Sequence, residues 1–160
     1  MTQLLGLTAL VGFCLSIVVH VSALFGVDVL AKAPYVWLLH LGIFVVFIPL
    51  VFSSRKVFGA NPSLSTIRSA FPAWVVVLGV GIFAYAALNF LLFALATDGG
   101  SPSMQNGRFI LQSHGRFVRE LSSTEYTAFR ANEVRGFSGH WLAFYFISFA
   151  YFMFRRRGEA

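Results

Sequence analysis

Four long apolar segments that contain no charged residue limit this chain to folds that a lipid bilayer can hold. They comprise residues 4–27, 35–52, 71–96 and 137–154. A helix rises about 1.5 Å per residue, so these segments would be roughly 27–39 Å long as helices. The hydrocarbon core of a bilayer is about 30 Å thick, and a charge at its centre costs at least about 2.5 kcal/mol. We therefore predict an all-α integral membrane protein, a bundle of four transmembrane helices in a single membrane domain over residues 1–160.

Clusters of basic residues lie beside the ends of the apolar segments, while the five arginines of residues 97–136 are nearly balanced by four acidic residues, so the net charge of +6 does not indicate a nucleic acid. Arg55, Lys56 and Arg68 lie between the second and third segments, and Arg155–Arg157 follow the fourth. Basic residues at such positions orient membrane proteins with their positive side in the cytoplasm. We therefore expect the lipid bilayer as a partner, no nucleic acid, and both termini in the cytoplasm, with residues 97–136 on the opposite, extracytoplasmic side.

Residues 97–136 form the one stretch with the pattern of a water-exposed insert. The ranges 108–112 and 116–121 are rich in Phe, Ile, Leu and Val, and a Ser-His-Gly sequence at 113–115 separates them. This pattern predicts a β-hairpin with a tight turn, in which the glycine supplies the positive φ. A lone hairpin is marginally stable in water, so it needs apolar cover from a neighbouring element.

A short helix is predicted to follow the hairpin and to cover it. Ser122 and Glu125 have the spacing of a capping box, in which each side chain bonds the backbone N–H of the other residue. The helix should run from about Ser123 to Arg135 and end at Gly136, because glycine is common just after a helix. The insert is thus expected to be a β-hairpin plus a helix between the third and fourth membrane helices.

A block of motifs joins the insert to the head of the fourth segment. It contains Asn106-Gly107, His114-Gly115, Leu121, Glu125-Tyr126, Arg135, Phe137-Ser138-Gly139-His140-Trp141 and Phe144-Tyr145. This block, residues 106–145, resembles small, uncharacterised multipass proteins of the bacterial inner membrane. The resemblance implies a location in that membrane and implies no activity.

Four polar residues within the apolar segments are the candidate binding residues. His20, His40, Asn89 and His140 lie roughly 5–11 Å inside the outer ends of their helices, at about 1.5 Å per residue. Ionisable residues inside a membrane face the bundle interior and are candidates for function. His20 also continues a row of small residues four apart, Thr8, Gly12 and Ser16. Such a row is expected to pack closely against another helix.

Three interpretations of these residues stay open. The histidines and Asn89 can hydrogen-bond across helices and fix their packing, at about 0.6–2 kcal/mol each. His20, His40 and His140 can instead ligate a metal ion or a haem iron, with Asn89 beside them in the cofactor site. The same residues can also line a polar pocket for a quinone, a lipid headgroup or a proton path.

Sequence motifs of soluble enzymes are missing from this chain. It contains no GxSxG, HExxH, CxxC or Walker pattern, and no apolar segment holds a carboxylate. We therefore expect a non-enzymatic accessory or interaction protein of the membrane, whose protein partner binds residues 97–136. The alternative is a haem-, metal- or quinone-binding protein that uses His20, His40, His140 and Asn89.

Overall fold

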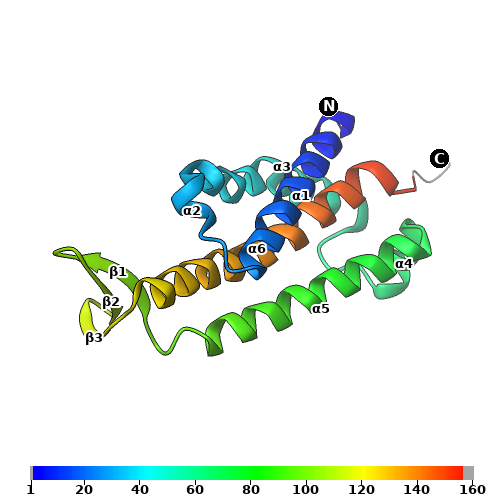
Figure 1. The fold of residues 1–160 in the computed structure, drawn as a ribbon. Helices are drawn as coiled ribbons and strands as arrows, with labels where there is room; N and C mark the ends of the chain where they lie inside the picture. Colours follow the sequence, from blue (N-terminus) through cyan, green and yellow to red (C-terminus); the bar gives the residue numbers. More distant parts are fainter. Residues whose placement is uncertain (1, 157–160) are drawn as a thin grey trace.

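The computed structural model describes residues 2–156, which form long helices, shorter helical segments and one small sheet (Figure 1). The elements are α1 (Thr2–Leu24), α2 (Val29–Lys32), η1 (Pro34–Trp37), α3 (Leu38–Phe58), α4 (Leu64–Ala70), α5 (Ala73–Leu95), β1 (Ser101–Gln105), β2 (Arg108–Ser113), β3 (Arg116–Glu120) and α6 (Ser123–Phe154). Within these residues, four helices are long and apolar enough to cross a membrane: α1, α3 together with η1, α5 and α6. The four predicted helices are confirmed, and their insertion into a membrane stays a prediction.

Helix α6 is the centre of the bundle, with α1 and α3 on one side and α5 on the other (Figure 1). In the most apolar part of α6, 56% of the residues are buried, against 17% for both α3 and α5. Small residues permit the neighbouring helices to approach α6 closely. A side-chain carbon at Gly12 of α1 would overlap the Tyr145 ring, and one at Gly139 of α6 would overlap Asn89. Such contacts associate helices in a membrane, where lipid removes the hydrophobic driving force.

The buried face of α1 differs in part from the predicted row of small residues. Gly12, Ser16 and His20 are buried as predicted, but Thr8 is exposed. Four residues turn a helix through about 400°, so a row of residues four apart drifts by about 40° at each step. The buried face therefore continues through Ala9 instead of Thr8.

The fourth membrane helix is longer than predicted, because α6 continues unbroken through Gly136. The predicted helix end at Gly136 is wrong, since this residue is buried inside α6 and faces the Phe93 ring of α5. At about 1.5 Å per residue, the 32 residues of α6 span about 48 Å, roughly 18 Å more than a bilayer core. The first turns of α6 therefore extend beyond the predicted span 137–154 and carry the insert. We call residues 97–136 the cap.

The cap contains a three-stranded antiparallel sheet in the order β1-β2-β3, one strand more than the predicted hairpin. The predicted strands are confirmed as β2 and β3, and the turn between them has positive φ at His114 and Gly115. The additional strand, β1, begins at Ser101-Pro102, whose composition is that of a loop. Asn106-Gly107 joins β1 to β2 with φ of 50° and 77°, the signature of a two-residue hairpin turn.

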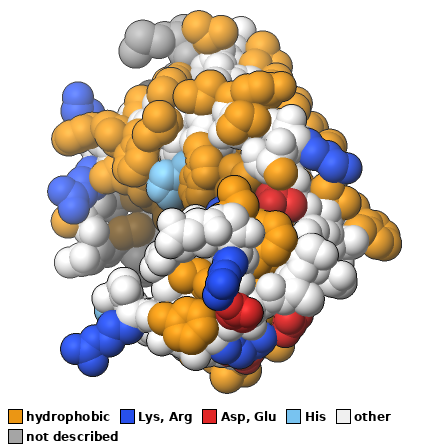
Figure 2. Space-filling view, turned by 60° about the vertical axis from the view of Figure 1, so that its left-hand side comes forward, with side chains coloured by type: hydrophobic (Ala, Val, Ile, Leu, Met, Phe, Trp, Pro, Cys, Tyr) orange, Lys and Arg blue, Asp and Glu red, His pale blue; other side chains and the backbone are white. Residues whose placement is uncertain are grey.

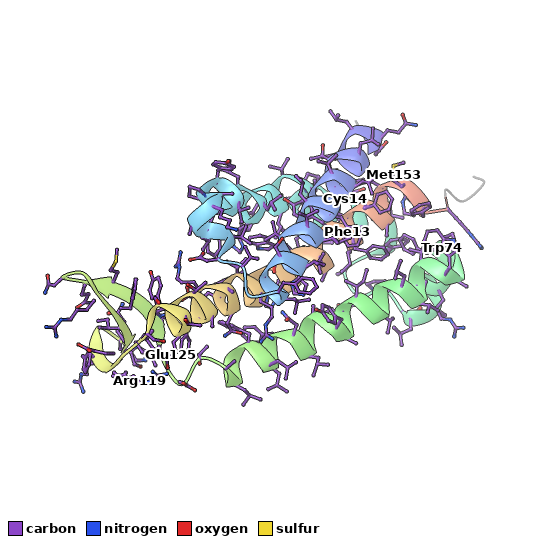
Figure 3. All side chains as sticks on the ribbon, viewed as in Figure 1. Phe13, Cys14, Trp74, Arg119, Glu125 and Met153 are labelled. Carbon is purple, nitrogen blue, oxygen red and sulfur yellow. The ribbon has the colours of Figure 1, made fainter. Side chains whose placement is uncertain are left out.

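The described ends of the chain lie at the end of the bundle opposite the cap (Figure 1). Figure 3 marks this end by Trp74 and Met153, and the cap by Arg119 and Glu125. We call it the inner end, after the predicted orientation. The Arg156 N–H donates to the Ala70 carbonyl at 2.8 Å, which ties the end of the chain to α4. This arrangement is the one expected for four spans, while the identity of the membrane and the side that each end faces stay predictions.

The connection predicted between the second and third spans is largely helical. Arg55 and Lys56 lie in the last turn of α3, because this helix continues to Phe58. Ser63 then caps the short α4, where its Oγ accepts from the Thr66 N–H at 3.1 Å.

Candidate functional site

His20 and Asn89 lie in a buried hydrogen-bond network between α1, α5 and α6. His20 Nδ1 bonds Ser138 Oγ at 2.7 Å, and His20 Nε2 bonds Tyr85 Oη at 2.6 Å. The carbonyl oxygen of Arg135 accepts from Asn89 Nδ2 at 2.9 Å and from Ser138 Oγ at 3.3 Å. Both ring nitrogens of His20 are thus used inside the bundle. These contacts suit the packing interpretation of His20 and Asn89.

His40 and His140 lie elsewhere, in the wall of a pocket of about 260 Å³ between α3, α5 and α6. The other lining residues are Phe90, Phe93, Gly136, Phe137 and Phe144, and we call this the histidine pocket. The His140 and Phe90 rings meet edge-on, with centroids 5.1 Å apart. Figure 2 shows histidine surface set among hydrophobic side chains. The structure thus divides the four predicted residues between a packed network and a pocket.

Hydrogen bonds at Nδ1 fix opposite tautomers on the two imidazoles of the pocket. The Trp141 Nε1–H donates to His40 Nδ1 at 3.0 Å, so His40 Nδ1 carries no proton. The Gly136 carbonyl can only accept, so His140 Nδ1, 3.0 Å away, carries the proton. A neutral imidazole holds one N–H. His40 therefore keeps a proton on Nε2, and His140 keeps a lone pair there.

This set of donors does not suit a metal ion held by the three histidines together. A metal needs an unprotonated ring nitrogen, and hydrogen bonds already occupy both nitrogens of His20 and place the Nε2 proton on His40. In residues 2–156, no three His, Cys, Asp or Glu side chains come together as a metal site would require. The histidine pocket suits an organic ligand that accepts at one position and donates at another.

Sequence reasoning missed the partners that define these two places, above all Tyr85, Ser138 and Trp141. A signal existed for Trp141, because a buried indole N–H needs an acceptor and the neighbouring apolar segments offer few besides histidine. Its side chain is 1% exposed. Tyr85 and Ser138 gave no comparable signal, since their pairing with His20 depends on how α5 and α6 are rotated.

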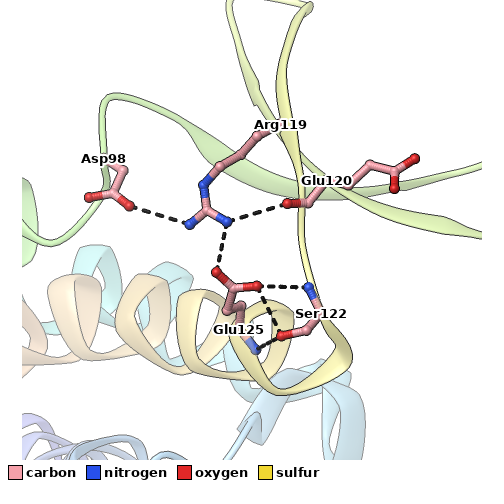
Figure 4. Close-up of polar contacts among 5 residues, drawn as sticks. All are labelled: Asp98, Arg119, Glu120, Ser122 and Glu125. Atoms are coloured by element: carbon pink, nitrogen blue, oxygen red, sulfur yellow. Dashed lines mark hydrogen bonds and ion pairs between the residues drawn. The ribbon is translucent and has the colours of Figure 1, made fainter.

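Arg119 fastens the sheet to the start of α6 (Figure 4). Its Nη1 donates to Glu125 Oε1 at 2.7 Å and to the Glu120 carbonyl at 3.3 Å, and its Nη2 lies 3.5 Å from Asp98 Oδ2. The predicted capping box is confirmed: the Ser122 N–H donates to Glu125 Oε2 at 2.8 Å, and the Glu125 N–H donates to Ser122 Oγ at 3.2 Å. The Ser122 N–H above all, and then Arg119, lower the pKa of Glu125 to about 2.

The two faces of the sheet differ in what they contact. On one face, Phe109 stacks on Tyr126 of α6 with ring centroids 4.5 Å apart, which confirms that the helix covers the hairpin. The other face has a hollow of about 410 Å³. It is lined by Gln105, Asn106, Arg108, Ile110, Phe117 and Glu120, which we call the outer sheet face. Phe117 is 63% exposed there, and Arg108 pairs with Glu120 at 3.1 Å. Figure 2 shows charged side chains gathered toward this end of the molecule.

No family model matches the chain, and no curated protein or solved structure is significantly similar to it.

Proposed function

We propose that this chain is a non-enzymatic multipass protein of the bacterial inner membrane that binds another protein through the outer sheet face. The observation that carries this proposal is Phe117, an exposed aromatic ring on a hollowed surface that also holds an ion pair. Aromatic and arginine side chains are enriched where proteins bind one another. The ring would supply affinity, and the Arg108–Glu120 pair beside it would orient the partner.

The proposal is supported by how firmly the sheet is held. Arg119 joins β3 to Asp98 and Glu125, and the Leu121 N–H donates to the Phe109 carbonyl at 2.8 Å. Further along α6, Arg130 Nε lies 3.5 Å from Asp28 Oδ2, which links the helix to the segment after α1. A surface held in this way loses little conformational entropy when a partner binds.

The proposed orientation places both termini in the cytoplasm and the cap outside. It is supported by charge: the basic residues at the cap end are accompanied by the described acidic residues, whereas Arg55, Lys56, Arg68, Arg155 and Arg156 at the inner end have no described acidic residue among them. Single cysteines at Ser101 and Arg68, in a chain whose exposed Cys14 is replaced by serine, test it. An impermeant maleimide should label Ser101→Cys in intact cells and Arg68→Cys only after permeabilisation. The reverse pattern contradicts the orientation, and labelling of both from one side contradicts the four crossings.

The partner proposal is tested with a photo-reactive phenylalanine analogue at position 117 in living cells. The same analogue at Thr127, which is exposed on the cap part of α6, is the matched control. We expect one discrete cross-linked protein from position 117 and none from position 127. The variant Phe117→Ser should release this protein, whereas Thr127→Ser should retain it. Equal cross-linking at both positions, together with purification as a lone protomer from mild detergent, contradicts the proposal.

A further inference from the structure

The histidine pocket has the size and the walls of a site for one aromatic ring. Its volume is about 260 Å³, and an apolar cavity of about 150 Å³ is enough to bind benzene. Four of its seven lining residues are phenylalanines, whose faces and edges suit a flat ring. The pocket thus has room for a ring with substituents.

The two imidazoles give this apolar pocket two polar groups of opposite kind. On both rings, Nδ1 is bonded inside the bundle, so Nε2 is the nitrogen that a ligand can use: a donor on His40 and an acceptor on His140. The roles are fixed, because the Trp141 indole can only donate and the Gly136 carbonyl can only accept. A ligand that satisfies both imidazoles must accept from one and donate to the other.

We propose that the histidine pocket binds the ring of a membrane-soluble hydroquinone. One ring hydroxyl accepts from His40 Nε2–H, and the other donates to His140 Nε2. The corresponding quinone has carbonyl oxygens at both positions, so its second oxygen would face the lone pair of His140 with no proton between them. The site therefore prefers the reduced ring. His40, Phe90 and His140 lie in predicted membrane spans, so the ligand enters from the lipid.

Calorimetric titration of the purified protein tests this proposal under anaerobic conditions. The probes are a decyl-substituted benzohydroquinone and the matching quinone. The hydroquinone should bind about tenfold more tightly, which corresponds to one hydrogen bond of about 1.4 kcal/mol. The variant His140→Phe keeps a flat ring against Phe90 and removes the acceptor. It should lose about tenfold in hydroquinone affinity and lose the preference for the reduced ring.

Control variants separate this site from the cap. His114→Asn changes a histidine outside the pocket at a positive φ that asparagine tolerates, and Phe117→Ser changes the outer sheet face. Both should bind the hydroquinone as the unaltered protein does, so the two proposals can fail independently. Equal affinity for the two rings, unaltered binding by His140→Phe, or no binding of either ring to the folded protein overturns the hydroquinone site.

Nitrogen NMR of labelled histidines gives a readout that needs no variant to fold. Before ligand is added, His40 should show a protonated Nε2 and His140 a protonated Nδ1. Hydroquinone should shift the Nε2 signals of both residues, while His114 stays unchanged. The same tautomer on both rings, or shifts confined to one of them, contradicts the proposed contacts.

Discussion

The outer half of the helical bundle, next to the cap, is joined by directed polar contacts, whereas the inner half is joined mainly by apolar packing. In the outer half, His20 bonds Tyr85 and Ser138, and the Trp141 indole donates to His40. Asn89 of α5 adds a bond to the backbone of α6. Three helices are thus tied to α6 at fixed atoms.

In the inner half, an apolar groove of about 420 Å³ lies between α3, α4, α5 and α6. Leu50, Phe71, Val75 and Phe146 are among its lining residues. A polar contact between helices at this end is the bond between Ser53 Oγ and Tyr151 Oη, at 2.8 Å. The helices around this groove are therefore held mainly by packing contacts, which depend on the shapes of the side chains and lack the direction of hydrogen bonds.

The difference shows where a bundle of this kind can hold a defined ligand site. Hydrogen bonds have direction and strengthen where the dielectric is low, so they fix the rotation of a helix about its axis. Apolar contacts between membrane helices are less specific, because lipid chains can replace them at similar energy. A pocket that depends on two fixed tautomers therefore belongs in the outer half, and the inner half is free to adapt.

Replacing one tryptophan in each half is the strongest test of this contrast. Trp141→Ala should lower the free energy of unfolding by about 3–5 kcal/mol, because this side chain is 1% exposed and donates to His40. Trp74 is 53% exposed at the inner end and meets Phe154 edge-on with centroids 5.0 Å apart. Trp74→Ala should lower the free energy of unfolding by only about 0.5–1.5 kcal/mol. Unfolding by SDS in mixed micelles measures both, and equal losses would remove the contrast.

A pair of glycines tests how tightly each half packs around α5. A side-chain carbon at Gly136 would lie 2.5 Å from Phe93 Cγ, whereas one at Gly79 would lie 3.4 Å from Phe146 Cε1. Gly136→Ala should therefore destabilise the fold by about 1–3 kcal/mol through overpacking, and Gly79→Ala should change it by less than about 0.5 kcal/mol. The same SDS titration in mixed micelles measures both changes. A larger loss of unfolding free energy for Gly79→Ala would show that the inner half, not the outer half, is the more tightly packed.

Acid should loosen the cap before it affects the bundle. The pKa of Glu125 is about 2 in the folded cap against 4.5 ordinarily. The ionised carboxylate therefore stabilises the cap in full above about pH 4.5, and this stabilisation is lost as the pH falls toward 2. Hydrogen exchange of residues 97–136, corrected for intrinsic rates, should rise over this range. Glu125→Gln should remove that rise. The control Glu120→Gln changes a carboxylate in an exposed pair with Arg108 and should retain the rise in exchange. A rise that persists in Glu125→Gln shows that protonation of Glu125 is not its cause.

The sequence was sufficient for features that depend on nearby residues. Runs without charge predicted the four helices, and runs rich in Phe, Ile, Leu and Val on either side of a Ser-His-Gly turn predicted β2 and β3. The Ser122 and Glu125 spacing predicted the start of α6. Each of these signals lies within one continuous stretch of the chain, so no knowledge of the tertiary arrangement was needed.

Features that depend on distant partners could not be predicted in the same way. Gly136 can end a helix or permit close packing, and only the Phe93 ring across from it decides between these roles. β1 lacks the composition of a strand and is held by its register with β2. One of the open interpretations placed His20, His40 and His140 in one site, because they lie at similar depth and His20 continues the row of small residues in the first helix. Their rotation about the helix axes, which depth does not describe, places His20 in a different network.

Two hydroxyl deletions give the smallest and most specific test of the contrast between the halves. Tyr85→Phe leaves Nε2 of the buried His20 without its partner. Ser53→Ala leaves the hydroxyl of Tyr151 without its partner, but Tyr151 lines a pocket of about 20 Å³ together with Arg155, which has room for one water to replace the lost bond. Hydrogen bonds between membrane helices average about 0.6 kcal/mol and reach about 1.7. Tyr85→Phe should lower the free energy of unfolding by an amount near the upper value, and Ser53→Ala should lower it by less than the average. A double-mutant cycle with Ser138→Ala should show coupling to Tyr85→Phe through His20 and none to Ser53→Ala. If Ser53→Ala is the more costly change, burial of the polar network is not what distinguishes the outer half.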